Sequence, residues 1–596
     1  MMKSFRKNFL CVVLSLVGLS FNLFAQIPMD YEKGLEFIDK KDIKNSITFL
    51  ASDKLKGRAA GTEENLEAAR FIAKKFYEFG LQPYSESKTY LSAFTEHEDD
   101  EEGIEIKPQE NAKTDFYDKY FQKFYLTNSK LNENNCRLTL IKKNLVGEYS
   151  ISYKLKKDFI ISYKSQKGIS FKAPIVFVGY GIENGDNNYN DYLSKDGREI
   201  NVKNKIVLLI DGYPQENDAN SEFNKSKNIL YRNIRKKSEI AMKKGAIAVF
   251  VVQSPLKQNP PFVVKFENMS SALLKSEFSL PEIKTKESIP IIYVSSEFVN
   301  DLLSGSDINL TGLLNVIDEN LISNPFEVSE TTIELSIDFD VDLIPTQNVI
   351  GYLEGTDSLL KNEFVIVGAH YDHIGLGQYG AMYKKNIGQI HNGADDNASG
   401  TSGVIELAEA FSKSKQKRSI VFIAFSAEEN GILGSRYYAS LNPFKKIENT
   451  IAMVNLDMIG RNEPELVWIG GIFFSEDLKK VVQDANEKIG FELLYNVGLL
   501  NFGSDQGPFI RKQIPSLFFF TGLHDDYHTP DDDVDKINFD KAERVAKLAY
   551  LSTWILANQE GKPKYRESTM DEKIVLVKES LERQKKYRPE NKKHNN

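Results

Sequence analysis

The stretch Phe364-Val-Ile-Val-Gly-Ala369 is an apolar run, and His370-Tyr-Asp372 follows it directly. A short apolar run of this kind is typical of a strand that is buried on both faces of a sheet. Three more such runs follow in the chain, at Ser419–Phe425, Thr450–Leu456 and Ser516–Phe520. Helical segments separate them. We therefore predict an α/β fold with a mainly parallel central sheet flanked by helices.

Two segments carry the spacing of amphipathic helices. In Ser402–Phe411, residues Val404, Leu407, Ala408 and Phe411 fall on one helical face. Near the N-terminus, Ile43–Leu81 has apolar residues at helical spacing and ends beside Gly80, which suits a helix C-terminus. We predict a helix in each segment.

Polar, ionisable residues follow the four predicted strands. They are His370 and Asp372 after the first strand, Glu428 and Glu429 after the second, Asp457 after the third, and His528 after the fourth. Parallel strands end at the same edge of their sheet, and ligands bind at that edge in open α/β folds. The sequence therefore predicts one site built from these residues.

An aspartate pair, Asp395-Asp396, stands just before the predicted helix at Ser402–Phe411. A pair in this place fits a helix cap as well as a metal ligand. The other candidate ligands nearby favour the metal role.

The ligand types favour zinc. Histidine nitrogens with carboxylates suit a borderline divalent ion better than a thiolate site or an all-oxygen site does. Two zinc ions bring four positive charges, of which Asp395, Glu429 and Asp457 offset three. A carboxylate shared by both ions would hold them about 3.5–4 Å apart, which suits the activation of water.

Two further acids are expected to act without binding zinc. Of the adjacent Glu428 and Glu429, one can bind metal while the other takes a proton from water. Asp372 is placed to accept the second ring N–H of His370 and so fix its tautomer.

Five stretches together resemble the M28 family of co-catalytic zinc metallopeptidases. They are Val367–His373, Asn392–Gly400, Phe425–Gly431, Val454–Gly460 and Asp526–Pro530, and the resemblance extends to Leu50–Arg58 and Asn348–Gly355. The resemblance implies that His370 and Asp457 hold one zinc ion. It implies that Glu429 and His528 hold the other, with Asp395 bridging the two ions.

The same resemblance implies further roles. Glu428 would be the general base, and a cis peptide bond would join Asp395 to Asp396. His373 and His391 would not be ligands, and His524 would lie at the rim. One departure is Gln506, where related sequences often carry a histidine; glutamine still donates a hydrogen bond but cannot become cationic.

The predicted activity is that of an aminopeptidase acting on peptides or proteins. The second interpretation is a carboxypeptidase of the glutamate carboxypeptidase type. Arg461 is then one candidate for binding a substrate carboxylate. A single-zinc glutaminyl cyclase and a non-catalytic, receptor-like binding protein on the same scaffold are further alternatives.

The chain of 596 residues is too long for one ordinary domain. We predict a signal peptide at 1–25, an N-terminal part of the peptidase domain at 26–165, and an inserted module at 166–330. The catalytic domain resumes at 331–560, and a charged tail fills 561–596. The β-rich insert resembles a protease-associated (PA) domain through Val178–Ile182 and Lys244–Ala248.

The basic start Lys3–Lys7 and the apolar run Phe9–Leu19 predict export to the periplasm or the extracellular space. After cleavage we expect no stable membrane span. The net charge of −8 argues against nucleic acid as a partner. The acidic stretch Glu96–Glu105 is expected to be a solvated loop. The oligomeric state stays open.

Overall fold

The computed structural model describes residues 30–83, 115–162, 168–183, 188–225, 232–281, 288–441, 443–495 and 501–587. The predicted signal peptide and the acidic stretch Glu96–Glu105 lie outside these ranges. The chain forms two compact units. The discontinuous unit comprises residues 1–125 and 345–596, and the inserted unit comprises residues 126–344.

The inserted unit is longer than the predicted 166–330. Its boundaries fall inside two long strands, β2 (Phe121–Leu131) and β14 (Phe339–Leu353), which belong partly to each unit. Because a continuous strand carries no linker-like change of composition, neither boundary can be recognised from the sequence.

The main sheet has parallel strands at its centre. Its strand order is β10-β2-β14-β16-β15-β17-β20-β18-β19, with β1 paired to β14. The pairs β16–β15, β15–β17 and β17–β20 are parallel, whereas β14–β16 and β18–β20 are antiparallel. The remaining bounds are β1 Gln82–Pro83, β10 Glu277–Ser279, β15 Phe364–His370, β16 Ser419–Phe425, β17 Thr450–Leu456, β18 Leu466–Gly470, β19 Glu492–Leu494 and β20 Ser516–Phe520.

The four predicted strands are confirmed, with β15 one residue longer than expected. Successive side chains of a strand point to opposite faces of the sheet, and an apolar cluster covers each face. In β15, Val365 and Val367 join one apolar cluster, while Phe364 and Ile366 join another. This is why the strands read as continuous apolar runs.

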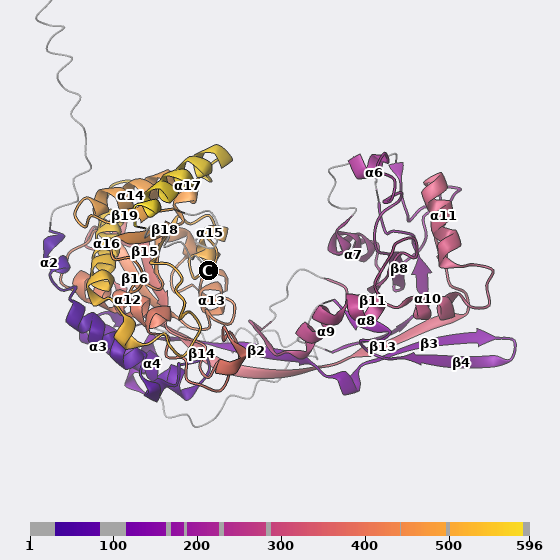
Figure 1. Ribbon diagram of the computed structural model, residues 1–596, viewed down its shortest axis with the longest axis horizontal. Helices are drawn as coiled ribbons and strands as arrows, with labels where there is room; N and C mark the ends of the chain where they lie inside the picture. The colour runs from indigo at the N-terminus through magenta and orange to yellow at the C-terminus, as the bar shows by residue number, and fades with distance from the viewer. Residues whose placement is uncertain are drawn as a thin grey trace, which may run out of the picture. The chain divides into compact units, whose positions relative to one another are not determined.

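Helices beside the main sheet (Figure 1) contribute to both clusters together with the other strands. One cluster includes side chains from α3, α4, α12 and α16, and the other includes side chains from α13 and α15. The helices of this unit are α2 Glu32–Leu35, α3 Lys40–Leu50, α4 Glu63–Glu78, α12 Gly400–Ser412, α13 Leu433–Ser440, α14 Glu476–Asn486, α15 Gly507–Arg511, α16 Phe539–Asn558 and α17 Met570–Lys585.

The prediction that Ile43–Leu81 is helical is confirmed in part. Two helices, α3 and α4, occupy this region, and a turn separates them. The turn contains Lys56, Gly57 and Arg58, all with positive φ, which a helix does not allow. The predicted end is confirmed, since Gly80 follows α4 with φ of +79°.

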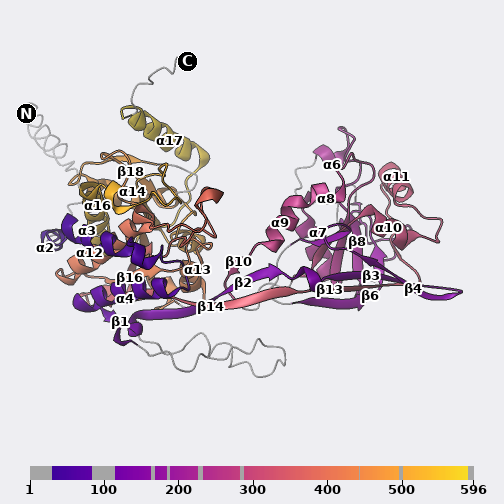
Figure 2. The ribbon, with the colours of Figure 1, turned by 60° about the horizontal axis from the view of Figure 1, so that its bottom comes forward.

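The inserted unit holds two smaller sheets (Figure 2). A six-stranded sheet has the order β12-β7-β8-β9-β11-β5, and a four-stranded antiparallel sheet has the order β4-β3-β13-β6. The strands are β3 Arg137–Asn144, β4 Gly147–Tyr153, β5 Phe159–Ile161, β6 Ile169–Ala173, β7 Ile175–Phe177, β8 Ile206–Ile210, β9 Ala248–Val252, β11 Ile291–Val294, β12 Phe326–Glu327 and β13 Thr331–Ile337.

Among the described residues of this unit, the helices are α6 Glu222–Lys225, α7 Ile234–Lys243, α8 Phe262–Lys265, α9 Glu267–Leu274, α10 Ser296–Leu303 and α11 Leu310–Asn320. The two sheets confirm the expectation that the insert is rich in β-strands. The resemblance to a PA domain stays a prediction.

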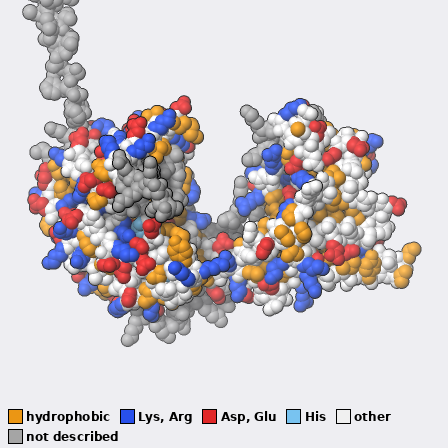
Figure 3. All heavy atoms as spheres, viewed as in Figure 1, with side chains coloured by type: hydrophobic (Ala, Val, Ile, Leu, Met, Phe, Trp, Pro, Cys, Tyr) orange, Lys and Arg blue, Asp and Glu red, His pale blue; other side chains and the backbone are white. Residues whose placement is uncertain are grey.

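On the face drawn in Figure 3, basic and acidic side chains are interspersed over both units. Within the described ranges, none of the helices combines the length and the apolar character that a membrane crossing needs.

One buried acid ties the stability of the discontinuous unit to pH. Glu406 of α12 is 1% exposed, and its Oε2 accepts a hydrogen bond from the backbone N–H of Asp39, 3.2 Å away. Burial, together with the nearby Asp42 and Glu409 carboxylates, raises the pKa of Glu406 to about 8. The folded state therefore holds this proton between about pH 4.5 and pH 8, where the unfolded chain releases it.

We therefore expect wild-type stability to fall as pH rises through this window. Glu406→Gln, which keeps the acceptor and cannot ionise, should match the wild type near pH 4.5 and exceed it by a few kcal/mol, as an order of magnitude, above pH 8. Urea unfolding at both pH values measures the difference, with the exposed Glu582→Gln as the matched control. Equal stability of wild type and variant at pH 8.5 would contradict the prediction.

Candidate metal centre

The carboxyl ends of four neighbouring strands bring the predicted site residues together. His370 ends β15, and the pair Glu428-Glu429 follows β16. Asp457 directly follows β17, and His528 lies in the loop after β20. Because these four strands are adjacent in the sheet, the loops that follow them meet at one edge.

Two groups of metal-ligand type form at this edge. The first is His370, Asp396 and Asp457, and the second is His373, Asp396, Glu429 and His528. Within each group the ligand atoms lie within 4.8 Å of one another. Asp396 belongs to both groups, so its carboxylate links them.

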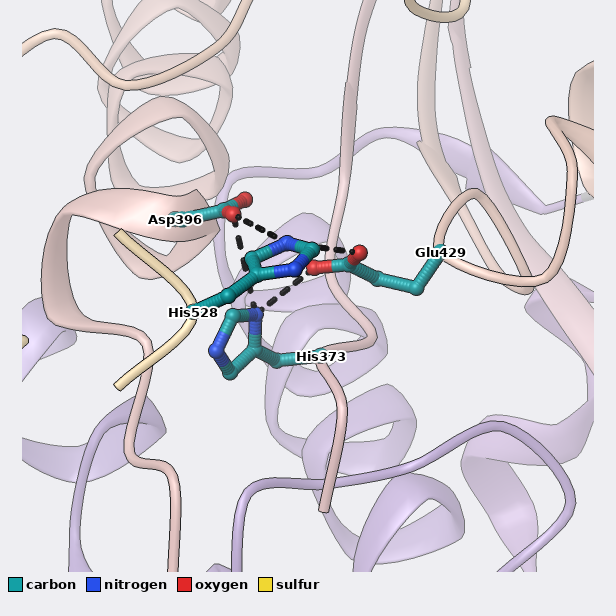
Figure 4. A group of neighbouring side chains, drawn as sticks. All are labelled: His373, Asp396, Glu429 and His528. Atoms are coloured by element: carbon teal, nitrogen blue, oxygen red, sulfur yellow. Dashed lines mark hydrogen bonds and ion pairs between the residues drawn. The ribbon is translucent and has the colours of Figure 1, made fainter. Parts of the chain in front are cut away.

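Each oxygen of Asp396 faces a different group. Its Oδ1 lies 3.4 Å from His370 Nε2, and the same nitrogen lies 3.5 Å from Asp457 Oδ1. Its Oδ2 lies 3.2 Å from His528 Nε2, and that nitrogen lies 3.0 Å from Glu429 Oε2 (Figure 4). This is the arrangement expected of a carboxylate that bridges two ions.

The structure therefore corrects the predicted position of Asp395, because its neighbour Asp396 occupies the shared place. Asp395 Oδ1 accepts a hydrogen bond from Gly460 N at 2.7 Å, and its Oδ2 lies 3.5 Å from His524 Nε2. The cis peptide bond joins Asp396 to Asn397, one residue later than predicted. Two identical adjacent side chains gave the sequence no means of choosing between them. Neither caps α12, whose N-cap residue is Ser399.

Asp532, which the sequence analysis missed, holds the backbone of this aspartate pair. Its carboxylate accepts hydrogen bonds from Asp395 N at 3.1 Å and Asp396 N at 3.0 Å. Its backbone carbonyl accepts from Ala394 N at 3.0 Å. The carboxylate thus satisfies two amides that no helix bond serves, and so fixes where Asp396 points. The one feature of the sequence that could have indicated Asp532 is its position four residues after the predicted ligand His528.

Arg58, which ends the predicted Leu50–Arg58 motif, holds the same loop from the other side. Its guanidinium is completely buried and donates to the carbonyls of Asn392, Gly393 and Asp396. It also donates to the Tyr371 carbonyl, next to His370. Burial lowers the pKa of Arg58 to about 10, which leaves it cationic at neutral pH. The arginine of this motif therefore has a structural role: it holds the backbone around His370 and Asp396.

Asp372 has a different partner from the one predicted. The ring Nδ1 of His370 is hydrogen-bonded to the backbone carbonyl of Asp372 at 3.1 Å, while the carboxylate stays 3.7 Å away. That carboxylate instead accepts from Glu428 N at 3.1 Å and Glu429 N at 3.4 Å. Asp372 therefore positions both glutamates through their backbone, and its main chain orients His370.

Asp457 and Gln506 are linked through neighbouring polar groups. Ser504 donates to Asp457 Oδ2 at 2.7 Å, which leaves Oδ1 on the side of His370. Gln506 is buried, and its Oε1 accepts from Asn455 at 2.9 Å. The glutamine that replaces the expected histidine is thus part of a buried hydrogen-bonded network.

Other residues weighed from the sequence fall outside the two groups. His391 Nδ1 contacts the Gln389 carbonyl at 2.9 Å. The expectation that His524 lies at the rim is wrong, since its side chain is 4% exposed and faces Asp395. Arg461 donates to Asp526 at 2.6 Å, so a partly buried ion pair already engages it.

The electrostatics of the centre are dominated by crowded acids. Burial, reinforced by neighbouring carboxylates, raises the pKa of Glu428 well above its usual range. Burial likewise raises the pKa of Asp372 to about 7 and that of Asp457 above its normal value. For His528 burial acts the other way, but Glu429 and Asp396 outweigh it and raise the pKa to about 11. Cations bound among these acids would relieve their repulsion.

Residues 348–553 match the model of peptidase family M28. Aminopeptidase YwaD of Bacillus subtilis is 28% identical over 246 residues, which is 40% of this chain and 50% of that protein. Leucine aminopeptidase 2 of Trichophyton equinum is 27% identical over 186 residues, which is 30% of this chain and 34% of that protein.

This chain therefore spans half or less of the length of these two relatives. Among solved structures, an aminopeptidase from Aneurinibacillus sp. strain AM-1 aligns with 91% of this chain and 98% of its own, at 20% identity and a TM-score of 0.42. Every residue of the two ligand groups falls within the matched residues 348–553. The chain thus contains a domain of peptidase family M28.

Proposed function

We propose that this protein is an exported two-zinc exopeptidase that removes residues from the amino end of peptides. The observation that carries the proposal is Asp396, which offers one carboxylate oxygen to each of two ligand groups. Relatives of the matched domain that are named aminopeptidase or zinc metalloprotease support it. Export rests on the N-terminal sequence pattern alone.

The donor set fits zinc. Histidine nitrogens and carboxylate oxygens are the ligands that catalytic zinc prefers. His370 and Asp457 would hold one ion, Glu429 and His528 the other, and Asp396 would join them. His370 Nδ1 and His528 Nδ1 each contact a backbone carbonyl, at 3.1 and 2.8 Å, which leaves Nε2 of each ring for an ion.

Zinc ions held there would polarise the scissile carbonyl and make an attacking water more acidic. Glu428 supplies the proton transfers. Its Oε2 lies 3.9 Å from His370 Nε2, beside the first group, and Asp372 fixes its backbone. A carboxylate in this place takes a proton from water and returns it to the leaving amine.

The charge of the centre favours substrates with a free amine. The acids around the centre outnumber the four positive charges that two zinc ions would bring, so the region attracts an ammonium group and repels a terminal carboxylate. Arg461, the candidate for binding a substrate carboxylate, is instead engaged by Asp526. These two observations favour an aminopeptidase over a carboxypeptidase.

The bridging role can be tested with adjacent variants. Asp396→Asn should lower the zinc content from two ions per chain because it removes a charge from both groups. Asp395→Asn keeps an acceptor for Gly460 N, so it should retain both ions. Elemental analysis after dialysis measures each. Loss of zinc from Asp395→Asn with retention in Asp396→Asn would refute the assignment.

Glu428→Gln should lower kcat by roughly 10²–10⁴-fold, since glutamine cannot accept the proton. The variant should keep two zinc ions, because Glu428 is not proposed as a ligand. Steady-state assays with an aminoacyl p-nitroanilide, alongside metal analysis, give both numbers. A variant with wild-type kcat would rule out this residue as the base.

A substrate panel distinguishes the alternative functions. Aminoacyl p-nitroanilides should be cleaved and N-acetylated ones should not. Chelation should abolish the activity, and zinc should restore it. Cleavage of N-blocked peptides from the carboxyl end would favour a carboxypeptidase instead. Cyclisation of N-terminal glutamine with one bound zinc ion would favour a glutaminyl cyclase.

A further inference from the structure

The centre holds a third histidine besides His370 and His528. It lies in the second ligand group, and the proposed zinc assignment leaves it unused. His373 comes three residues after His370 and is 1% exposed. Its Nδ1 lies 2.7 Å from Glu429 Oε1 and 3.9 Å from Asp396 Oδ2 (Figure 4). A buried imidazole beside a proposed ligand is either another ligand or a hydrogen-bond partner of that ligand.

The distances distinguish these two roles. Two ligand atoms about 2.1 Å from one tetrahedral zinc ion are roughly 3.4 Å apart. The pairs formed by His370 Nε2 with Asp396 and Asp457, at 3.4 and 3.5 Å, match this separation. The pairs formed by His528 Nε2 with Asp396 and Glu429, at 3.2 and 3.0 Å, lie nearer to it than the His373–Glu429 pair does. The 2.7 Å between His373 Nδ1 and Glu429 Oε1 is shorter and is typical of a charge-assisted hydrogen bond.

The two oxygens of Glu429 therefore have different partners. Oε1 faces His373, while Oε2 faces His528 Nε2 at 3.0 Å, on the side where Asp396 Oδ2 also lies. A donor at Oε1 holds the carboxylate plane and turns one oxygen toward the proposed ion.

The His373 ring is itself held in place. A Cβ at Gly393 would lie 2.5 Å from Cγ and Cδ2 of His373, so only glycine leaves room for the ring there. On another side the ring meets His528 edge-on, with centroids 5.5 Å apart and an interplanar angle of 77°. A fixed ring is what a positioning role requires.

We propose that His373 is a positioning residue whose Nδ1–H donates to Glu429 Oε1, so that Glu429 binds the second zinc ion through Oε2 alone. The proposal rests on the proposed function, because it concerns the metal held by Glu429 and His528. Partners of this kind change the metal affinity of a site 10–100-fold, as an order of magnitude. The effect should be confined to one of the two ions.

Two variants of similar size separate a donor from a ligand. In His373→Asn the side-chain amide retains an N–H near the position of Nδ1 but provides no imidazole ligand. In His373→Leu neither a donor nor a ligand remains. Stepwise zinc dissociation constants are measured on the full chain by competition with a chromophoric chelator. Visible absorption of the cobalt-substituted protein reports the coordination number.

His373→Leu should lower the affinity for one of the two zinc ions by about 10–100-fold and leave the affinity for the other unchanged. His373→Asn should restore that affinity to within a few-fold of wild type and keep the wild-type cobalt spectrum. If Asn binds as weakly as Leu and its cobalt spectrum changes, His373 is a ligand and the proposal is wrong. Wild-type affinity in the Leu variant would also overturn it.

Two controls keep the result interpretable. Thermal unfolding of the metal-free variants shows whether each is folded; if the Leu variant is not, the comparison of Asn with wild type still decides between donor and ligand. A wild-type chain that binds fewer than two zinc ions would defeat the proposed function. A defect confined to the variants would defeat only the role of His373.

Discussion

The centre is organised by the need to keep many carboxylates close together and away from water. At least eight lie buried or nearly buried around the ends of the central strands: Asp372, Asp395, Asp396, Glu428, Glu429, Asp457, Asp505 and Asp532. An isolated buried carboxylate is strongly disfavoured unless it is hydrogen-bonded, paired or protonated. For six of these acids the structure meets this requirement in two different ways, and the division between them defines the site.

Some of these acids are satisfied by the protein itself. Asp372, Asp395 and Asp532 each accept backbone N–H bonds, and each thereby fixes a loop that carries another acid. The buried guanidinium of Arg58 adds a full positive charge and ties up carbonyls of the same loop. The acids turned toward the histidines, Asp396, Glu429 and Asp457, are those left to bind cations. The scaffold therefore uses one type of side chain both as structural support and as candidate ligand.

The sequence predicted what depends on periodicity and strand ends. Apolar runs located β15, β16, β17 and β20 because strands buried on both faces show an unbroken pattern. Ionisable residues after those runs then located His370, Glu429, Asp457 and His528 at one edge. These inferences need only the positions of the strands and of the residues that follow each strand, and both can be read from the sequence.

The sequence did not resolve what depends on side-chain direction. Asp395 and Asp396 are adjacent and identical, and only the local fold of the backbone decides which one lies between the two groups. The partner of the His370 ring is a main-chain carbonyl, which no side-chain pattern encodes. The segment between α3 and α4 contains positive φ values at Lys56 and Arg58. Lysine and arginine are not residue types from which such a turn is predicted. The role of Arg58 emerges only in three dimensions.

The reach of Arg58 has a consequence for how the centre comes into being. This arginine is synthesised early, but its partner carbonyl at Asn392 lies 334 residues further along the chain, and the whole inserted unit is made between them. His528 and Asp532 appear later still. Because domains form as the chain leaves the ribosome, the nascent protein contains the early support of the site long before any ligand group is complete. Both groups can be complete only after His528 has been made.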